Sequence, residues 1–438
     1  MRKISIAVIF SLIIMIIAPL TTVHAEYTPP FEVSADAVYM VNLDTGTVVY
    51  QKNANKKEYP ASLTKLVTTI LAMEKTPDLD NTMVKCTSSI LSEFDGMNAS
   101  NAGMRAGEER SMRDLIYCML LPSANEAASM VADYIGGSRA AFIDMMNKKA
   151  QEIGAVSTNF VNPHGLHDND HYTTAQDMYL IAKYAMQMPG FMDMCTKTSY
   201  ELKPSNKRDT EYIFTTNKMM VQSSGPDVYY KYARGIKTGT TDEAGRCCVS
   251  TATKDGYTYL LVVMNAPLND YEPPNMAFVE SKKLYEWAFS NFEVKELINA
   301  EKPVTEVPLK LNWDRDFLYL RAESAFTALV PKSTSDGDII QRLNIPKYVN
   351  APVKKGDVIG TVELMVMGDK VGSVNLLADN DASRSDVLYI LEVLKAATKS
   401  VWFYVGIGAF VLLLLIMIIG SFVVNRRRGP KFGSKSRY

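Results

Sequence analysis

Cysteine and histidine are scarce in this sequence. Its 438 residues include five cysteines and four histidines. Five cysteines are too few for a disulfide scaffold in a chain of this length, and their odd number leaves at least one thiol unpaired. Cys247 and Cys248 are adjacent in a strand-like run, so their side chains point to opposite faces and a bond between them would be strained. We therefore interpret these two cysteines as small apolar residues without a redox role.

The sequence also lacks an excess of charge of either sign. The formal net charge is -1, which argues against a nucleic-acid partner or a generic anionic partner. Internal repeats and low-complexity tracts are absent as well. Once the two apolar ends described below are set aside, roughly 375 residues remain, which suits two domains better than one hydrophobic core.

The first 25 residues have the pattern of a secretory signal peptide. A basic Met-Arg-Lys start is followed by an uncharged, mostly apolar run at residues 4–20 and a small-residue exit at 23–25. This order is typical of a cleaved signal. We expect cleavage after Ala25, so that the mature chain starts at Glu26, with an uncleaved anchor as the alternative.

A second apolar run, residues 401–424, lies near the other end and contains no charged residue. A helix needs about 20 apolar residues to cross a bilayer, so this run is long enough. Trp402 and Tyr404 lie at one edge, and the other edge is followed by a basic tail, residues 425–438. Positively charged flanks stay inside. We therefore predict a single span in the cell membrane, with the body of the protein outside and the tail in the cytoplasm; a buried core helix is the alternative.

The residues between these ends change periodicity along the chain. Alternating runs at 37–41 and 48–51 flank a turn and predict a hairpin. Helical spacing dominates from 63 to 186, strand-like runs return between 235 and 264, and a helical pattern follows at 276–292. This order predicts an α/β domain at residues 26–298, with a mixed or antiparallel sheet and a helical block.

The composition changes near Lys302, where short alternating runs rich in Pro, Val, Gly and Lys begin. Short strands with frequent turn signals predict a small all-β domain at residues 299–384. Residues 385–400 are predicted to form a linker helix that leads into the membrane span.

Ser62 and Lys65 form the first candidate for chemistry, an S-x-x-K pattern where a helical segment begins. The start of a helix offers free backbone N–H groups and the positive end of the dipole, which suits an attacking oxygen. Lys65 lies one turn further on the same face, within reach of the Ser62 hydroxyl. It can act as a base only if burial or a neighbouring cation lowers its pKa. The pattern alone is weak, because an N-cap serine followed by a surface lysine looks the same.

Two further patterns follow along the chain. Ser123 and Asn125 form an S-x-N at a break between two helical segments, where a plain helix cap is the simpler interpretation. Lys237, Thr238 and Gly239 form a K-T-G on an apparent strand. A strand edge can pair with an extended peptide, Gly239 would let the substrate backbone come close, and Lys237 would supply a cation for a carboxylate. Either pattern is common by itself.

The three patterns in this order are the combination found in class A β-lactamases and penicillin-binding proteins. The sequence resembles the low-molecular-mass penicillin-binding proteins, the serine-type D-alanyl-D-alanine carboxypeptidases. The resemblance extends to further segments, at residues 60–65, 162–166, 172–178, 235–241 and 351–357. It implies a penicillin-binding-protein or β-lactamase-like α/β domain, then the small all-β domain and the transmembrane helix.

The resemblance also implies a role for each site residue. Ser62 would be the acylated nucleophile, Lys65 its general base and Ser123 a proton relay. The substrate-binding residues would be Asn125, Lys237, Thr238, Gly239 and Thr240. Backbone N–H groups of Ser62 and Thr240 would form the oxyanion hole, and the two lysines would lower each other's pKa. The implied partners are the peptidoglycan stem pentapeptide ending in D-Ala-D-Ala and β-lactam antibiotics, with neither metal nor cofactor.

The sequence departs from the family in one place and leaves alternatives open. Some relatives carry another arginine before residues 280–283, where this chain has Ala277, Phe278 and Val279; Arg234 could compensate. A D,D-endopeptidase would use the same residues. A β-lactamase is disfavoured because an E-x-x-x-N loop is missing between the second and third patterns. A catalytically silent scaffold is disfavoured because the serine, both lysines and the asparagine are intact.

A zinc peptidase is the remaining alternative, since three histidines cluster in one segment. His164, His167 and His171 lie close to Asp168 and Asp170, and metal ligands are often grouped in this way. None of the usual ligand spacings fits, and the family resemblance places His164 in a structural loop. We therefore expect a polar loop rather than a metal site.

Overall fold

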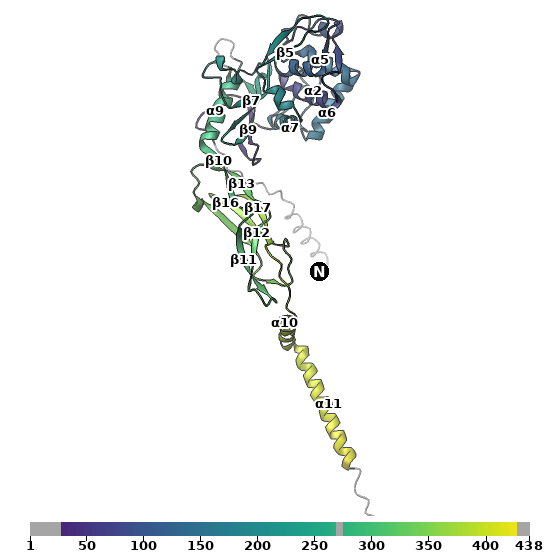
Figure 1. Cartoon of the computed structure of the whole chain (residues 1–438), viewed down its shortest axis with the longest axis vertical. Helices are drawn as coiled ribbons and strands as arrows, with labels where there is room; N and C mark the ends of the chain where they lie inside the picture. The colour runs from purple at the N-terminus through teal and green to yellow at the C-terminus, as the bar shows by residue number, and fades with distance from the viewer. Residues whose placement is uncertain (1–27, 269–274, 427–438) are drawn as a thin grey trace, which may run out of the picture. The chain divides into compact units, whose positions relative to one another are not determined.

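The computed structural model describes residues 28–268 and 275–426; the predicted signal peptide and most of the predicted basic tail lie outside these ranges. The described chain divides into two compact units (Figure 1). Unit 1 runs to Lys295 and includes Thr327–Ile339 and Val366–Asp369. Unit 2 consists of Glu296–Phe326, Ile340–Met365 and the chain from Lys370 onward. The domain boundaries read from the sequence stay predictions.

Unit 1 is built on a five-stranded sheet. Its order is β2 (Val48–Lys52), β1 (Ala37–Asn42), β9 (Tyr257–Ala266), β8 (Gly245–Lys254) and β7 (Ala233–Thr241). All neighbouring strands are antiparallel. The predicted hairpin and the predicted late strands are therefore confirmed. Strand β7 is the last in this order, so it forms an edge of the sheet.

The sheet separates two hydrophobic cores. Every residue of β1 is buried, because both faces of the sheet are covered. Neighbouring residues of a strand enter different cores: Cys247 belongs to the core of the helical block, and Cys248 belongs to the core on the other face. All five cysteines are free and buried. The interpretation of Cys247 and Cys248 as apolar residues is confirmed.

The helical block covers one face of the sheet. Its longer helices are α2 (Lys65–Lys75), α4 (Met112–Leu120), α5 (Asn125–Gly136), α6 (Arg139–Ile153) and α7 (Ala175–Met186). Side-chain oxygens of Ser111, Ser138 and Thr174 accept backbone N–H bonds at the starts of α4, α6 and α7, which stabilises those ends. Gly137 and Gly154 end α5 and α6 in the left-handed conformation. These helices confirm the periodic segments expected from the sequence.

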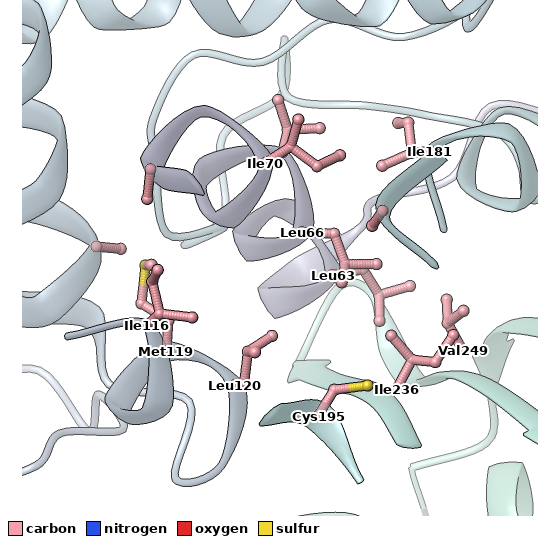
Figure 2. Close-up of a cluster of buried hydrophobic side chains, with 14 of the residues drawn as sticks. Leu63, Leu66, Ile70, Ile116, Met119, Leu120, Ile181, Cys195, Ile236 and Val249 are labelled. Carbon is pink, nitrogen blue, oxygen red and sulfur yellow. The ribbon is translucent and has the colours of Figure 1, made fainter. Parts of the chain in front are cut away.

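The start of α2 is anchored in this core. Leu63 and Leu66 pack with Leu120 of α4 and with Ile236 and Val249 of the sheet (Figure 2). All five side chains are buried, and each contributes about 1.5–3 kcal/mol through burial of apolar surface. The segment around Ser62 is therefore held from both the helical and the sheet side.

The other face of the sheet is covered by α9 (Met276–Asn291), as the helical pattern at 276–292 predicted. Several short elements of unit 1 were not predicted. They are α3 (Ser88–Ser92), α8 (Phe191–Cys195), the pair β3 (Met83–Lys85) and β4 (Glu109–Ser111), the pair β5 (Ser199–Leu202) and β6 (Glu211–Phe214), and the turns η2 (Lys218–Met220) and η3 (Gln222–Ser224). Strand β10 (Phe292–Ile298) pairs with β13 (Phe326–Pro331). Elements this short show too few turns or alternations for a periodic signal.

Unit 2 contains the predicted all-β domain. Its six-stranded sheet has the order β14 (Ile339–Asn344), β16 (Val358–Val366), β17 (Asp369–Ala378), β12 (Phe317–Ala322), β11 (Pro303–Lys310) and β15 (Val349–Asn350). Helix α10 (Asp386–Thr398) follows, and then α11 (Val401–Arg426). Within the described residues, Val401–Val423 of α11 is the one helix long and apolar enough to cross a membrane.

Candidate active site

Ser62 lies in a 3-10 turn, η1 (Ala61–Thr64), which leads directly into α2. The turn is closed by a hydrogen bond from the Leu63 N–H to the Pro60 carbonyl. Ala61, Leu63 and Thr64 are buried, whereas Ser62 is partly exposed. The serine hydroxyl is therefore accessible on a backbone that its buried neighbours hold in place.

Lys65 is fully buried and binds three oxygens. Its Nζ lies 2.9 Å from Ser62 Oγ, 2.7 Å from Asn125 Oδ1 and 2.6 Å from the His164 carbonyl oxygen. Burial lowers the pKa of Lys65 well below its usual value, and the nearby positive charge of Lys237 lowers it further, while Glu126 opposes the shift. Lys65 therefore lies beside Ser62, and its lowered pKa favours the neutral amine over the ammonium.

The break between α4 and α5 brings the S-x-N pattern to the same place. Ser123 has a φ of 67°, a left-handed conformation that costs a non-glycine residue about 1–3 kcal/mol and is kept only where the surroundings enforce it. Here the next residue, Ala124, donates its N–H to the Cys118 carbonyl, and Asn125 donates its N–H to Ser100. This turn directs Ser123 Oγ to Lys237 and Asn125 Oδ1 to Lys65.

Strand β7 supplies the third pattern. Lys237 is buried, and its Nζ donates to Ser123 Oγ at 2.9 Å and to the Thr238 carbonyl at 2.8 Å. Burial lowers the pKa of Lys237 to about 7. The expected mutual lowering of the two lysine pKa values is thus seen for Lys65, whereas burial accounts for the shift of Lys237. The Thr238 hydroxyl lies 2.6 Å from the Thr216 hydroxyl.

Gly239 permits a close approach, but to a different backbone from the one expected. A Cβ at this position would lie 3.0 Å from Ser62 N and 3.1 Å from the Pro60 carbonyl oxygen. The absent side chain therefore makes room for the chain's own η1 turn, and this brings the Ser62 N–H next to the strand that carries Thr240. The Thr240 hydroxyl donates to the Gly239 carbonyl.

The loop at 162–166 contributes a carbonyl group that sequence reasoning missed. Gly165 has a φ of 87°, and a Cβ there would lie 1.8 Å from the Ala61 carbonyl oxygen, so only glycine allows this loop to contact η1. The contact places the His164 carbonyl next to Lys65. The loop was noticed only as part of the family resemblance, because a backbone carbonyl leaves no mark in the sequence.

A second missed group, Glu93, fixes His164. The Nδ1 atom of His164 accepts from the Leu166 N–H at 3.2 Å, so its Nε2 carries the hydrogen and donates to Glu93 Oε1 at 2.9 Å. Arg139 donates to both oxygens of Glu93. Burial opposes ionisation of Glu93, but the bonds from His164 and Arg139 outweigh it and lower the pKa of Glu93 to about 2. Glu93 is thus a carboxylate that anchors the loop beside Lys65.

The three clustered histidines have separate surroundings. His164 binds Glu93, His171 Nε2 lies 2.7 Å from the Thr64 hydroxyl, and His167 packs against the Tyr59 ring. Within residues 28–268 and 275–426, no group of three His, Cys, Asp or Glu side chains is arranged to hold a metal ion. The Arg234 guanidinium donates to carbonyls of its own segment, at residues 231 and 233.

Known proteins match this chain over both units. Residues 22–268 match the D-alanyl-D-alanine carboxypeptidase family, peptidase S11, and residues 292–384 match the penicillin-binding protein 5 C-terminal domain. The D-alanyl-D-alanine carboxypeptidase DacF of Bacillus subtilis is 28% identical over 360 residues, covering 82% of this chain and 88% of its own length. DacA of Haemophilus influenzae is 29% identical over 366 residues, and the match again covers 82% of this chain and 88% of the relative.

Solved structures agree with the sequence matches. Penicillin-binding protein 5 from Haemophilus influenzae superposes with a TM-score of 0.65 at 27% identity, over 82% of this chain and all of that one. The carboxypeptidase DacD from Francisella tularensis superposes with a TM-score of 0.63 at 25% identity, over 82% of this chain and 96% of that one. The predicted fold class and family resemblance are confirmed. Because the family match spans more than half of the sequence, the chain belongs to the D-alanyl-D-alanine carboxypeptidases, a family of serine peptidases.

Proposed function

We propose that the chain removes the terminal D-alanine from peptidoglycan stem pentapeptides through an acyl-enzyme on Ser62, which would limit cross-linking of the wall. The observation that carries this proposal is the set of partners around Lys65. A neutral amine has two N–H groups and one lone pair. Asn125 Oδ1 and the His164 carbonyl only accept hydrogen bonds, so they take the two N–H groups. The lone pair is then left for the Ser62 hydroxyl, as general-base catalysis requires.

Acylation follows from this arrangement. The terminal carboxylate of the peptide would pair with Lys237, beside the edge of β7. Ser62 Oγ attacks the carbonyl carbon of the penultimate D-alanine while its proton passes to Lys65 Nζ. The oxyanion would be held by the backbone N–H groups of Ser62 and Thr240, and one such donor is worth roughly 10²–10³ in rate. The C–N bond then breaks, and the leaving D-alanine amine takes the proton that Lys65 Nζ accepted, with Ser123 Oγ as the proposed relay, so Lys65 is neutral again.

Deacylation repeats the same chemistry with water. Lys65 accepts a proton from the water that attacks the ester, and it passes this proton to Ser62 Oγ as the C–O bond breaks. The products are the shortened peptide and D-alanine. A β-lactam offers the same pairing of a carbonyl with a nearby carboxylate, but its leaving amine stays attached after ring opening. We therefore propose that penicillin acylates Ser62 covalently.

The test is to map the adduct and follow the product together. Labelled penicillin should appear on the peptide that contains Ser62, and D-alanine release from the pentapeptide should stop once the label is bound. Exposed Ser89 offers a matched control, since Ser89→Ala should leave both results unchanged. A missing adduct would favour a silent scaffold. Rapid loss of the label would favour a β-lactamase, and inhibition by a chelator would favour a zinc enzyme. Cleavage of cross-linked peptides at a similar rate would favour endopeptidase action.

We also propose that the chain is exported and anchored by α11, with unit 1 and the β sheet of unit 2 outside the membrane. The length and apolar composition of Val401–Val423 support this topology, as do the basic residues after it. Removing residues 401–438 should release an active protein into the soluble fraction, because the span adds no group to the site. A truncated protein that stays in the membrane fraction would instead indicate an uncleaved N-terminal anchor.

A further inference from the structure

The sheet of unit 2 has aromatic side chains on its outward face. Phe317 and Tyr319 lie two residues apart on β12, so they share one face, and they are 49% and 51% exposed. Pro308 of β11 is the Cα partner of Phe317 and is also exposed. Tyr348 precedes β15, which pairs with β11 in parallel. Lys310 Nζ lies 3.4 Å from the centre of the Tyr348 ring, so these two residues share that face as well.

The turn between β11 and β12 adds Trp313, which at 72% is more exposed than Phe317, Tyr319 or Tyr348. This turn is tied to the start of α10. The Ser385 N–H donates to the Leu311 carbonyl at 2.7 Å, and Asn312 Nδ2 donates to the Ser383 carbonyl at 2.8 Å. The aromatic end of the sheet is therefore the end from which the chain continues towards α11.

Helix α10 has no buried residue, and nothing in the described ranges 28–268 and 275–426 covers its apolar face. Val387, Ile390, Leu391 and Leu394 lie at helical spacing on one side, and each is between 55% and 60% exposed. A helix of this length spans about 20 Å. If it stood upright, it would hold the sheet that far from the bilayer with its apolar side in water. Lying along the bilayer surface buries that side and brings the Trp313 turn to the membrane.

We propose that an aromatic patch on unit 2, formed by Pro308, Trp313, Phe317, Tyr319 and Tyr348, contacts the lipid headgroup layer of the membrane in which α11 is anchored. Aromatic rings with a polar edge favour the boundary between headgroups and acyl chains, and the Lys310 stem can lie along Tyr348 with its charge at the headgroups. Large exposed apolar patches mark interaction sites. A lipid surface fits best because the span begins only a short helix away.

Charge is not the main attraction in this contact. The turn that carries Trp313 also carries Asp314, Arg315 and Asp316, a net charge of -1 that the neighbouring Lys310 offsets. The patch should therefore bind zwitterionic phosphatidylcholine about as well as a bilayer with added anionic lipid. This separates it from a polybasic segment, whose binding depends on anionic lipid.

The test compares Trp313 fluorescence in detergent and in lipid nanodiscs with the full-length protein. The signal of Trp313 is the difference between the unmodified chain and Trp313→Phe, an exposed substitution that leaves the core untouched. In phosphatidylcholine nanodiscs this difference signal should shift to shorter wavelength, lose its quenching by iodide and become quenched by a lipid spin-labelled near the headgroup. As a control, Met367→Trp in the Trp313→Phe background reports from the β16–β17 turn, where Met367 is 63% exposed.

The outcomes distinguish the proposal for the aromatic patch from the proposed membrane anchor, on which it depends. Equal iodide access at Trp313 and at the Met367→Trp control, in a chain that co-purifies with the nanodisc, would overturn the proposal while leaving α11 as an anchor. A chain that fails to enter nanodiscs would overturn both. Shielding of Trp313 by soluble glycan strands but not by the bilayer would assign the patch to the wall polymer instead.

Discussion

Replacing Lys237 by alanine tests whether the substrate carboxylate is bound where we propose. Among the described residues, the buried ammonium donates to Ser123 Oγ and to the Thr238 carbonyl, which leaves one of its three N–H groups for a ligand. A hydrogen bond to a charged group contributes about 1.5–3 kcal/mol. At about 1.4 kcal/mol per factor of ten, Lys237→Ala should slow acylation by a D-Ala-D-Ala peptide roughly 10- to 150-fold. Amidating the peptide's C-terminus should cost the unmodified enzyme a similar factor and the variant little more.

If Lys237 binds the substrate carboxylate, the preference for the free acid over the amide should depend on pH. Burial lowers the pKa of Lys237 to about 7, so its charge is present below this pH and is lost as the pH rises through it. The ratio of kcat/KM for the free acid to that for the amide should therefore fall above about pH 7. Taking the ratio cancels the titration of Lys65, which acts on both peptides. In Lys237→Ala, the acidic limb of both profiles should move to higher pH, because a charge that lowers the pKa of Lys65 is gone.

The assay is stopped-flow acylation with the acid and amide peptides, on the unmodified enzyme, on Lys237→Ala and on Lys231→Ala. Lys231 is an exposed lysine of the segment before β7, so its removal changes net charge equally without touching the site. Losses that simply add when the lysine and the carboxylate are both removed would refute the contact. Lys237 would then act by tuning Lys65 alone.

Three further predictions concern other parts of the site. Ser62→Ala should abolish covalent labelling by penicillin while the circular dichroism spectrum stays unchanged; labelling that persists would point to another nucleophile. Glu93→Ala should lower kcat about tenfold with little change in KM, because it releases His164 and with it one acceptor of Lys65; an unchanged acylation rate would mean that the loop holds without it. Gly165→Ala should lower the melting temperature far more than Gly154→Ala. Gly154 has a similar φ, but the atom nearest to an added Cβ is a side-chain atom 3.9 Å away. Equal losses would mean that backbone strain, rather than overlap of the new Cβ with its neighbours, decides the effect.

The long elements could be predicted because their sequence patterns repeat over several turns or alternations. The helices around residues 63–186 and the late strands fall within a few residues of the predicted segments. The site residues Ser62, Lys65, Ser123, Asn125 and Lys237 could be proposed because three short patterns occur in a fixed order. The structure joins the side chains of Ser62, Lys65 and Asn125 by hydrogen bonds, and it joins those of Ser123 and Lys237 by another.

The missed residues act through geometry that a sequence does not display. Glu93 and His164 are separated by 71 positions, and nothing in either neighbourhood marks them as partners. The carbonyl of His164 is a backbone group that any residue would offer. Gly239 was expected to make room for substrate, but the position of its missing Cβ faces the η1 backbone. Such roles depend on which distant segment folds against the residue, and this is decided by packing of the whole domain.

The placement of the cysteines gives the protein two internal reporters of local opening. Cys247 and Cys248 are neighbours in the chain but belong to different cores. Burial raises the pKa of both thiols to about 12, so neither reacts until its own side of the sheet opens. A thiol reagent with mass-spectrometric readout would therefore show which core opens first under denaturant. One pair of adjacent residues thus measures whether the helical block and the α9 layer unfold together or in turn.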